Sequence, residues 1–253
     1  MQRSLTTLVL FLVLIGATPA RGQETERKML DASEVPIEAA RTDGFAPKGW
    51  RIHKRAAGDL NGDGRSDVAM ILFDRALDDA SPRSGDVPAP ALLIVLATDH
   101  GRWRRAGVNT KLIFADDSGF APLNVRIING LVIVNQELLS NITANTLDYS
   151  YTDRFRYDSA ADRFMLIGED DANTHRDAVA DGIRVSDNYL TGERILTRMH
   201  AVRGKYVSET NIARRIERRR VFLEDLGAED IDFEKLWDEF SRPGSPITHR
   251  TAR

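Results

Sequence analysis

The sequence predicts a mainly β protein made of antiparallel sheets and hairpins, with α-helix confined to its C-terminal end. Two observations support this prediction. Short apolar runs rich in valine, isoleucine and leucine recur along the chain, and turns such as Asn-Gly separate several of them. One acidic, glycine-rich loop precedes one of these runs, whereas a propeller needs several such repeats at a fixed period. The sequence therefore predicts antiparallel sheets and excludes a propeller.

The N-terminal residues 1–22 have the order of a secretory signal. Arg3 is followed by an apolar run at 8–15 and then by small residues. We expect cleavage before Gln23, with cleavage after Ala20 as the alternative. An uncleaved anchor is disfavoured because the apolar run is shorter than the roughly 20 residues of a membrane span. We therefore expect a periplasmic or secreted protein of the bacterial envelope, without stable membrane insertion once the signal is removed.

The mature chain has a nearly balanced charge. Removal of the signal takes Arg3 and Arg21 from the 35 basic side chains of the whole chain, which leaves 33 against 38 acidic ones and a formal charge of −5. This balance gives no general attraction to nucleic acid. The chain has no cysteine, so a disulfide cannot stabilise it after export. We expect a polar leader at 23–45, a single β-rich domain at 46–240 and a disordered tail at 241–253.

The expected strands follow from apolar runs and from alternation of apolar and polar residues. The leader is expected to be mobile or to form one short helix. In order, the strands are expected at 50–52, 68–73, 92–96, 125–128, 131–134, 147–152 with 154–157, 164–167, 183–189 and 194–199. Asn129-Gly130, the turn at 158–162 and Thr191-Gly192 mark three hairpins. Residues 78–90 and 169–182 are expected to be loops, 208–226 fit either helix or strand, and 230–240 fit a short helix.

The nine residues 59–67 have the composition of a calcium loop. Oxygen-bearing side chains stand at alternate positions, Asp59, Asn61 and Asp63, and Asp67 ends the run. Calcium prefers six to eight oxygen ligands about 2.3–2.6 Å away. A short loop can direct several oxygens to one point only if it curls tightly, and the two glycines at 62 and 64 permit this. We therefore expect one structural Ca²⁺, held by these four side chains and by the carbonyl of Arg65.

Other kinds of calcium loop fit less well. An EF-hand has a glutamate at the twelfth position, where this chain has Met70, and it needs a helix on the downstream side, where we expect a strand. A dockerin needs two such loops. The remaining alternative is a plain Asn-Gly and Asp-Gly turn with surface aspartates, but three crowded carboxylates repel one another unless a cation neutralises them.

The run from Gly58 to Val68 resembles the calcium loop of FG-GAP/VCBS-type repeats. In those repeats a cation holds the loop between two strands, and the resemblance implies the same role for Asp59, Asn61, Asp63, Arg65 and Asp67. Across residues 45–226 the order of motifs is similar to that of a group of exported bacterial proteins of uncharacterised function. These motifs are Pro47-Lys48-Gly49-Trp50, the loop, 92–96, 151–157, 164–168 and 188–192.

No familiar catalytic motif stands in the chain. Its five histidines lack zinc-binding spacing, and neither a Gly-x-Ser-x-Gly elbow, a thiol nor a phosphate-binding glycine loop is present. Acidic pairs occur at 78–79 and 116–117 and a triplet at 169–171. Two of these acids facing one cleft would make a carboxylate-type hydrolase, although solvated loops are the simpler interpretation.

Five arginines in seven residues form the other notable feature, at 214, 215, 218, 219 and 220. They favour either an anion-binding or glycan-binding surface or, more simply, a solvated face balanced by the acidic stretch 224–239. The leading prediction is an exported calcium-binding scaffold or binding protein without catalytic activity, whose partner is an unknown protein or glycan. The hydrolase and the arginine surface are the alternatives.

Overall fold

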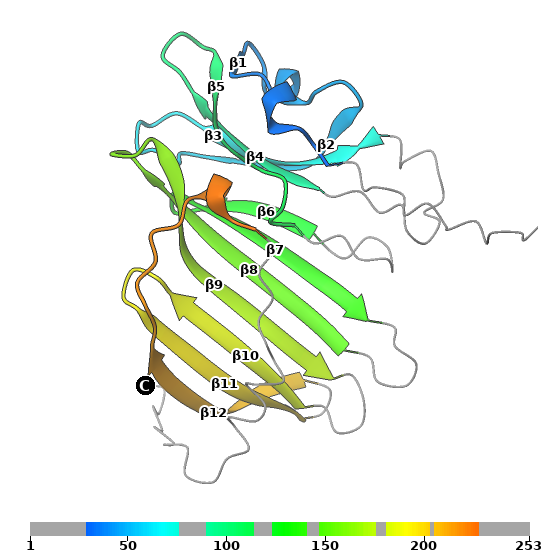
Figure 1. Ribbon diagram of the computed structural model, residues 1–253, viewed down its shortest axis with the longest axis vertical. Helices are drawn as coiled ribbons and strands as arrows, with labels where there is room; N and C mark the ends of the chain where they lie inside the picture. Colours follow the sequence, from blue (N-terminus) through cyan, green and yellow to red (C-terminus); the bar gives the residue numbers. More distant parts are fainter. Residues whose placement is uncertain are drawn as a thin grey trace, which may run out of the picture.

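The computed structural model describes residues 29–75, 90–113, 123–140, 147–175, 181–202 and 205–227, and these form two antiparallel sheets (Figure 1). Neither sheet closes into a barrel or a propeller, so the predicted mainly β fold class is confirmed. The 3-10 turns with bounds in these segments are η1 (Ala32–Glu34), η2 (Thr42–Phe45) and η4 (Leu223–Asp225). Within the same segments no helix is long and apolar enough to cross a membrane.

The smaller sheet has five strands in the order β1-β5-β4-β3-β2. Their bounds are β1 Glu38–Ala39, β2 Trp50–Gly58, β3 Asp67–Asp74, β4 Ala91–Ala97 and β5 Trp103–Asn109. Every residue of β3 and nearly every residue of β4 is buried. Successive side chains in a strand point to opposite faces, so both faces of this sheet must be covered. The uninterrupted apolar runs at 68–73 and 92–96 predicted these two strands correctly for that reason.

The larger sheet has seven strands in the order β12-β11-β10-β9-β8-β7-β6. Their bounds are β6 Leu123–Ile128, β7 Leu131–Ser140, β8 Leu147–Asp158, β9 Arg163–His175, β10 Asp181–Asn188, β11 Glu193–Val202 and β12 Lys205–Arg215. The three predicted hairpins are confirmed as β6–β7, β8–β9 and β10–β11. Asn129 and Gly130 have φ angles of 51° and 73°, as a two-residue hairpin turn of twisted strands requires.

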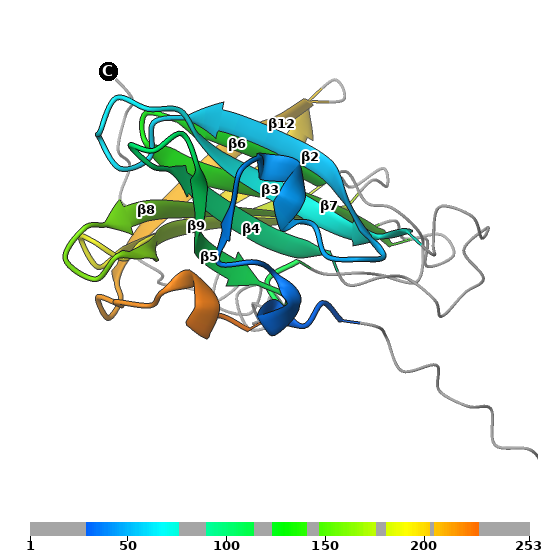
Figure 2. The ribbon, with the colours of Figure 1, turned by 90° about the horizontal axis from the view of Figure 1, so that it is seen from above.

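The main core lies between the two sheets. The smaller sheet covers the part of the larger one around β6, β7 and β8, while β10, β11 and β12 extend beyond it (Figures 1 and 2). Buried side chains of both sheets form one apolar cluster, with Ala69, Ile71, Phe73, Leu92, Ile94 and Leu96 from the smaller sheet and Val125, Val132, Val134, Phe155, Phe164 and Leu166 from the larger. Ridges of apolar side chains on facing sheets interdigitate in this way in sandwich folds.

The N-terminal segment differs from the expected mobile leader or single helix. Residues 29–45 contain η1, β1 and η2, and they cover the outer face of the smaller sheet. Leu30, Val35 and Phe45 are buried there against Trp50. Arg105 donates two hydrogen bonds of 2.7 Å from Nη1, to the carbonyls of Ala32 and Val35. Leu30, Val35 and Phe45 are irregularly spaced, so the sequence shows no periodic pattern for this segment. They nevertheless cover the apolar side chains that β3 and β4 direct to the outer face of the smaller sheet.

Three other expectations require correction. Residues 169–175 and 181–182, from the expected loop 169–182, belong to strands β9 and β10. Strand β5 was not predicted at all. The ambiguous segment 208–226 is not helical: its first part belongs to β12, and its later part contains only η4 and an isolated bridge between Phe222 and Met165. Several predicted features lie outside the described residues, namely the signal 1–22, the acidic pairs 78–79 and 116–117, the helix 230–240 and the tail 241–253.

Candidate metal loop and a buried acidic row

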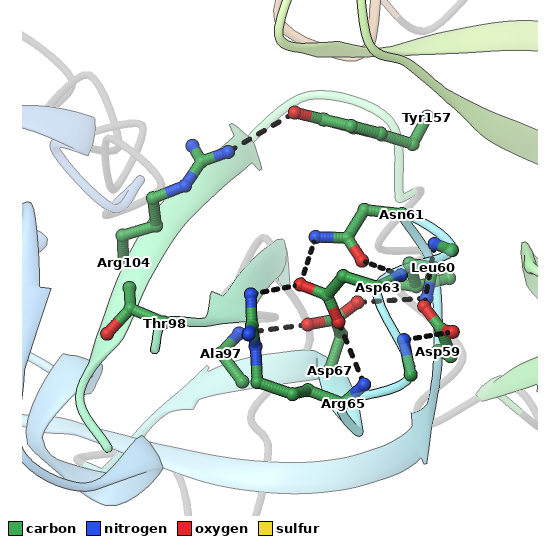
Figure 3. Close-up of polar contacts among 12 residues, drawn as sticks. Asp59, Leu60, Asn61, Asp63, Arg65, Asp67, Ala97, Thr98, Arg104 and Tyr157 are labelled. Atoms are coloured by element: carbon green, nitrogen blue, oxygen red, sulfur yellow. Dashed lines mark hydrogen bonds and ion pairs between the residues drawn. The ribbon is translucent and has the colours of Figure 1, made fainter. Parts of the chain in front are cut away.

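The predicted metal loop, residues 59–67, connects β2 to β3 at one end of the smaller sheet (Figure 3). Gly62 and Gly64 have φ angles of +79° and +81°, values that other residues rarely adopt. Together they curl the loop so that its side-chain oxygens turn back toward its own backbone. The structure therefore confirms the tight curl that the two glycines predicted.

Asp59 organises the first half of the loop. Its two carboxylate oxygens accept hydrogen bonds from the backbone N–H groups of Gly62, at 2.7 Å, and Gly64, at 2.9 Å. Asn61 acts in a similar way through Oδ1, which accepts the N–H of Asp63 at 3.1 Å. Such side-chain-to-backbone bonds stabilise turns that contain aspartate and asparagine.

Asp63 lies in the exposed half of the loop. Its Oδ1 accepts the backbone N–H of Arg65 at 2.8 Å, and its Oδ2 accepts both the Asn61 amide at 2.8 Å and the Arg65 guanidinium at 2.6 Å. These donors, first among them the Arg65 N–H and the Asn61 amide, hold the pKa of Asp63 below its usual value. The sequence predicts that Asp63 binds Ca²⁺, whereas in the structure its carboxylate is paired with the positive charge of the Arg65 side chain.

Asp67 ties the loop to the rest of the smaller sheet. It is fully buried, and its carboxylate accepts the N–H of Leu60 and the N–H of Ala97, each at 2.8 Å. Burial raises the pKa of Asp67, the two N–H donors act in the opposite direction, and the nearby charges of Asp63 and Asp59 raise it further. The three aspartates of the loop therefore lie close enough to repel one another.

The loop also lies against the second sheet. A Cβ atom on Gly58, the residue before the loop, would come within 2.6 Å of Ile127 Cγ2 in β6. A Cβ on Gly130, in the β6–β7 turn, would stand 3.7 Å from the carbonyl oxygen of Asp59. Leu60 is buried in the core between the sheets. The conformation of the loop consequently fixes where β2 and β3 meet the β6–β7 hairpin.

The side chains fit a cation only in part. All five predicted ligand residues lie in this one loop, but nowhere in the described segments do three or more His, Cys, Asp or Glu side chains gather closely enough to hold a metal ion. The carboxylates point to backbone N–H groups and, at Asp63, to Arg65. A carboxylate oxygen has two lone pairs, so each hydrogen-bonded oxygen keeps acceptor capacity. Binding of a cation would require Asp59, Asp63 and Asp67 to turn toward a common point.

A second group of acids lies on one face of the larger sheet, and it includes two residues of the acidic triplet 169–171 together with acids that the sequence did not single out. We call Asp153, Glu169, Asp171 and Asp187 the acidic row. Asp153 is paired with Glu169 across β8 and β9, and Glu169 with Asp187 across β9 and β10. Asp171 follows Glu169 two residues along β9, on the same face. Asp153, Asp171 and Asp187 are all buried.

Burial and mutual repulsion change the proton affinity of the acidic row. Burial raises the pKa of Asp171 to about 8, helped by the negative charges of Glu169 and Asp187. Burial likewise raises the pKa of Asp153 well above its usual value, with Glu169 and Asp171 adding to the effect. With a pKa of about 8, Asp171 keeps its proton in most molecules at pH 7.

Arg194 pairs with Asp187, and Tyr189 donates a hydrogen bond to Glu169. The Arg194 guanidinium donates to both oxygens of Asp187, at 2.7 and 2.6 Å. A solvated loop is the expectation from the sequence for the acidic triplet at 169–171, because acids are rarely buried, but the structure places the triplet in β9. The charged Asp170 stands between Glu169 and Asp171, so the sequence has no polar and apolar alternation that would place these acids on one face of a strand.

Comparisons of this chain with models of protein families, with curated proteins and with solved structures give no match. The resemblance of residues 58–68 to FG-GAP/VCBS repeats therefore stays a prediction from the sequence. Function is inferred from the chemistry of the sites, because a fold alone does not define an activity.

Proposed function

We propose that this protein is an exported β-rich scaffold or binding protein without catalytic activity, in which Ca²⁺ bound at residues 59–67 has a structural role. The observation that carries the proposal is the presence of Asp59, Asp63 and Asp67 in one glycine-curled loop, where the negative charges of Asp63 and Asp59 help to raise the pKa of Asp67. Crowded carboxylates are stabilised by a cation, and calcium is the hard cation that prefers such oxygen ligands.

A cation in this loop would stabilise more than the loop itself. The loop sets the β2–β3 turn, its last residue Asp67 is bonded to Ala97 in β4, and Gly58 brings its first end against Ile127 of β6. Neutralising the aspartates would therefore strengthen both the register of the smaller sheet and its contact with the larger sheet. A chain without cysteine gains from such a staple after export.

The hydrolase alternative gains no support from the acidic row. A carboxylate-type hydrolase needs two acids that a substrate and a water molecule can reach. Asp153 and Asp171 expose only 6% and 7% of their surface. Their burial and their raised pKa values fit a group that holds protons inside the sheet better than a group that contacts a glycan chain.

The test is a calcium titration of the mature chain from Gln23 by calorimetry, together with thermal melts in calcium and in chelator. We expect about one equivalent of calcium and a higher melting temperature with calcium, because a ligand that binds only the folded state stabilises it. Asp63→Ala should weaken calcium binding and should lower the melting temperature more in calcium than in chelator. Asp43→Ala, which removes an exposed aspartate paired with Arg41 in η2, is the matched control and should change neither.

Two outcomes would contradict the proposal. The first is the absence of calcium binding at millimolar concentration, which would reduce residues 59–67 to a self-capped turn. The second is an equal shift of the Asp63→Ala melting temperature in calcium and in chelator, which would show that Asp63 contributes only its hydrogen bonds to Asn61 and Arg65.

A further inference from the structure

The arginine-rich segment 214–220 wraps around the turn that connects β10 to β11. It begins at the end of β12, where Arg215 Nη1 donates to the carbonyl of Thr191 at 3.3 Å. The next residue, Ile216, donates its N–H to the carbonyl of Gly192 at 3.1 Å. These two bonds hold the segment in an extended form against the turn, so its arginines are distributed around the turn and not along a helix.

Gly192 permits this close approach. Its φ angle is +69°, and a Cβ atom there would stand 2.9 Å from the carbonyl oxygen of Ile216 and 3.1 Å from Arg218 Cγ. Arg218 therefore lies directly on the turn. Arg219 lies over the first residue of the turn, with its guanidinium carbon 5.8 Å from the centre of the Tyr189 ring. Arg215, Arg218 and Arg219 thus surround a turn of four residues, 189–192, and we call this group the arginine turn.

Of the acidic stretch 224–239, expected to balance these arginines, the structure describes residues 224–227, and both acids there have another partner. Glu224 and Asp225 both bind Arg163, at 2.8 and 2.9 Å. Arg220 pairs with Asp158 at 2.8 Å. Within the described part of the chain Arg215 and Arg218 form no ion pair, although Glu193 stands opposite Arg215 in the strand register. The side chains at 215, 218 and 219 are exposed.

We propose that the arginine turn binds the sulfate or phosphate ester groups of an acidic glycan. A guanidinium offers several N–H donors in a planar fork, which matches the oxygens of such esters, and its charge does not depend on pH in the working range. Several guanidiniums around one turn can share the three terminal oxygens of one ester. The chain as a whole carries a net charge of −3, so the attraction is local and not a property of the whole surface.

This inference names the class of glycan partner left open in the proposed function, but its site does not depend on calcium. The arginine turn lies on the larger sheet, whereas the metal loop belongs to the smaller sheet. Binding measured in chelator therefore tests the arginine turn alone, and calcium binding by a variant that lacks Arg215 and Arg218 side chains tests the metal loop alone. If glycan binding fails, calcium binding still tests the metal loop, and if calcium binding fails, glycan binding in chelator still tests the arginine turn.

The experiment measures binding of the mature chain to a sulfated heparin octasaccharide in chelator, with a desulfated, N-acetylated octasaccharide as the comparison ligand. Replacing Arg215 and Arg218 together by glutamine should weaken binding about tenfold, because two exposed charge-assisted contacts are lost. The control is the double replacement of Arg41 and Arg102, exposed arginines that directly precede η2 and β5 and pair with Asp43 and Glu38. It removes the same charge and should leave affinity unchanged.

Salt and small anions complete the test. Affinity should fall steeply as sodium chloride is raised, because exposed charges are screened within about 8–10 Å at physiological salt. Equal binding of the desulfated chain, equal loss in both double variants, or no binding would overturn the proposal. Pyrophosphate that binds as tightly as the octasaccharide would overturn the assignment to a glycan. Binding only to vesicles that contain anionic lipid would assign the arginine turn to a membrane surface instead.

Discussion

Asp67 and Ala97 stand 30 residues apart in the sequence, yet the carboxylate of the first accepts the backbone N–H of the second at 2.8 Å. The other oxygen of Asp67 accepts the N–H of Leu60 at the same distance. One buried side chain thus closes the metal loop and holds β4 beside β3. Because Asp67 satisfies two backbone donors at once, it links the candidate site to the fold.

Replacing Asp67 by asparagine should destabilise the protein even without calcium. An amide has one oxygen and one NH₂ group, so one of the two N–H donors would face another donor and remain unsatisfied. Such a loss costs about 1–3 kcal/mol of the free energy of unfolding. Urea denaturation in chelator measures it, with the exposed Asp43→Asn as the control. An effect of Asp67→Asn no larger than that of the control would show that the two bonds contribute little.

Arg65→Gln separates the two interpretations of the metal loop. The Arg65 guanidinium lies 2.6 Å from Asp63, and both side chains are partly exposed. If calcium binds through Asp63, the guanidinium competes with it, and its removal should increase calcium affinity. In chelator the same change should alter stability by less than about 1 kcal/mol, since exposed ion pairs contribute little. Calorimetric titration of the variant with calcium distinguishes a calcium site from a turn held only by its own hydrogen bonds. A lower calcium affinity in Arg65→Gln would contradict the proposed role of Asp63.

The sequence predicted the parts of this fold whose residues carry a local pattern. Strands β3 and β4 are uninterrupted apolar runs, and Asn129-Gly130 marks its hairpin without reference to the rest of the chain. Strand β5 was missed because Trp103-Arg104-Arg105 resembles a polar loop. Its arginines are stabilised by distant groups, Arg104 by Asp162 at 2.6 Å and Arg105 by the carbonyls of Ala32 and Val35.

The candidate sites show the same limit. The ligand residues of the metal loop are neighbours in sequence, so their spacing revealed them. The acidic row is assembled from three strands, and burial of Asp171 depends on pairing of β9 with β8 and β10. Similarly, the arginines at 215 and 218 were recognised as a cluster, but their position around Gly192 follows from the register of β11 with β12. Tertiary pairing of this kind leaves no local pattern to read.

The acidic row should make stability depend on pH. The pKa of Asp171 is raised to about 8 in the folded protein from an ordinary value of 3.8, so between these values the folded state retains a proton that the unfolded state has lost. Its contribution to stability is therefore full below about pH 4 and declines as pH rises toward 8, by up to about 1.4 kcal/mol per pH unit. Asp153, whose pKa is also raised, acts in the same direction.

Asp171→Asn tests this dependence, because an amide resembles the neutral carboxyl in size and does not titrate. Urea denaturation at pH 5 and at pH 8 should show a smaller decrease in stability for the variant than for the natural chain. The control is Asp162→Asn, which changes a more exposed aspartate whose pKa is lowered. This variant should lose as much stability between pH 5 and pH 8 as the natural chain does. A natural chain and an Asp171→Asn variant with parallel pH profiles would show that Asp171 titrates normally.

The contact between Gly58 and Ile127 should couple the metal loop to both sheets. A Cβ atom at position 58 would approach Ile127 Cγ2 to 2.6 Å, so Gly58→Ala must move β2 away from β6 or force the isoleucine to shift. Overpacking of this kind costs about 1–3 kcal/mol. Gly227→Ala is the matched control, because nothing lies within 4 Å of its added Cβ.

We expect Gly58→Ala to lower the unfolding free energy in urea and also to weaken calcium binding, since the displaced residue is continuous with Asp59. A destabilised variant that binds calcium with unchanged affinity would show that the loop folds independently of the contact between the sheets.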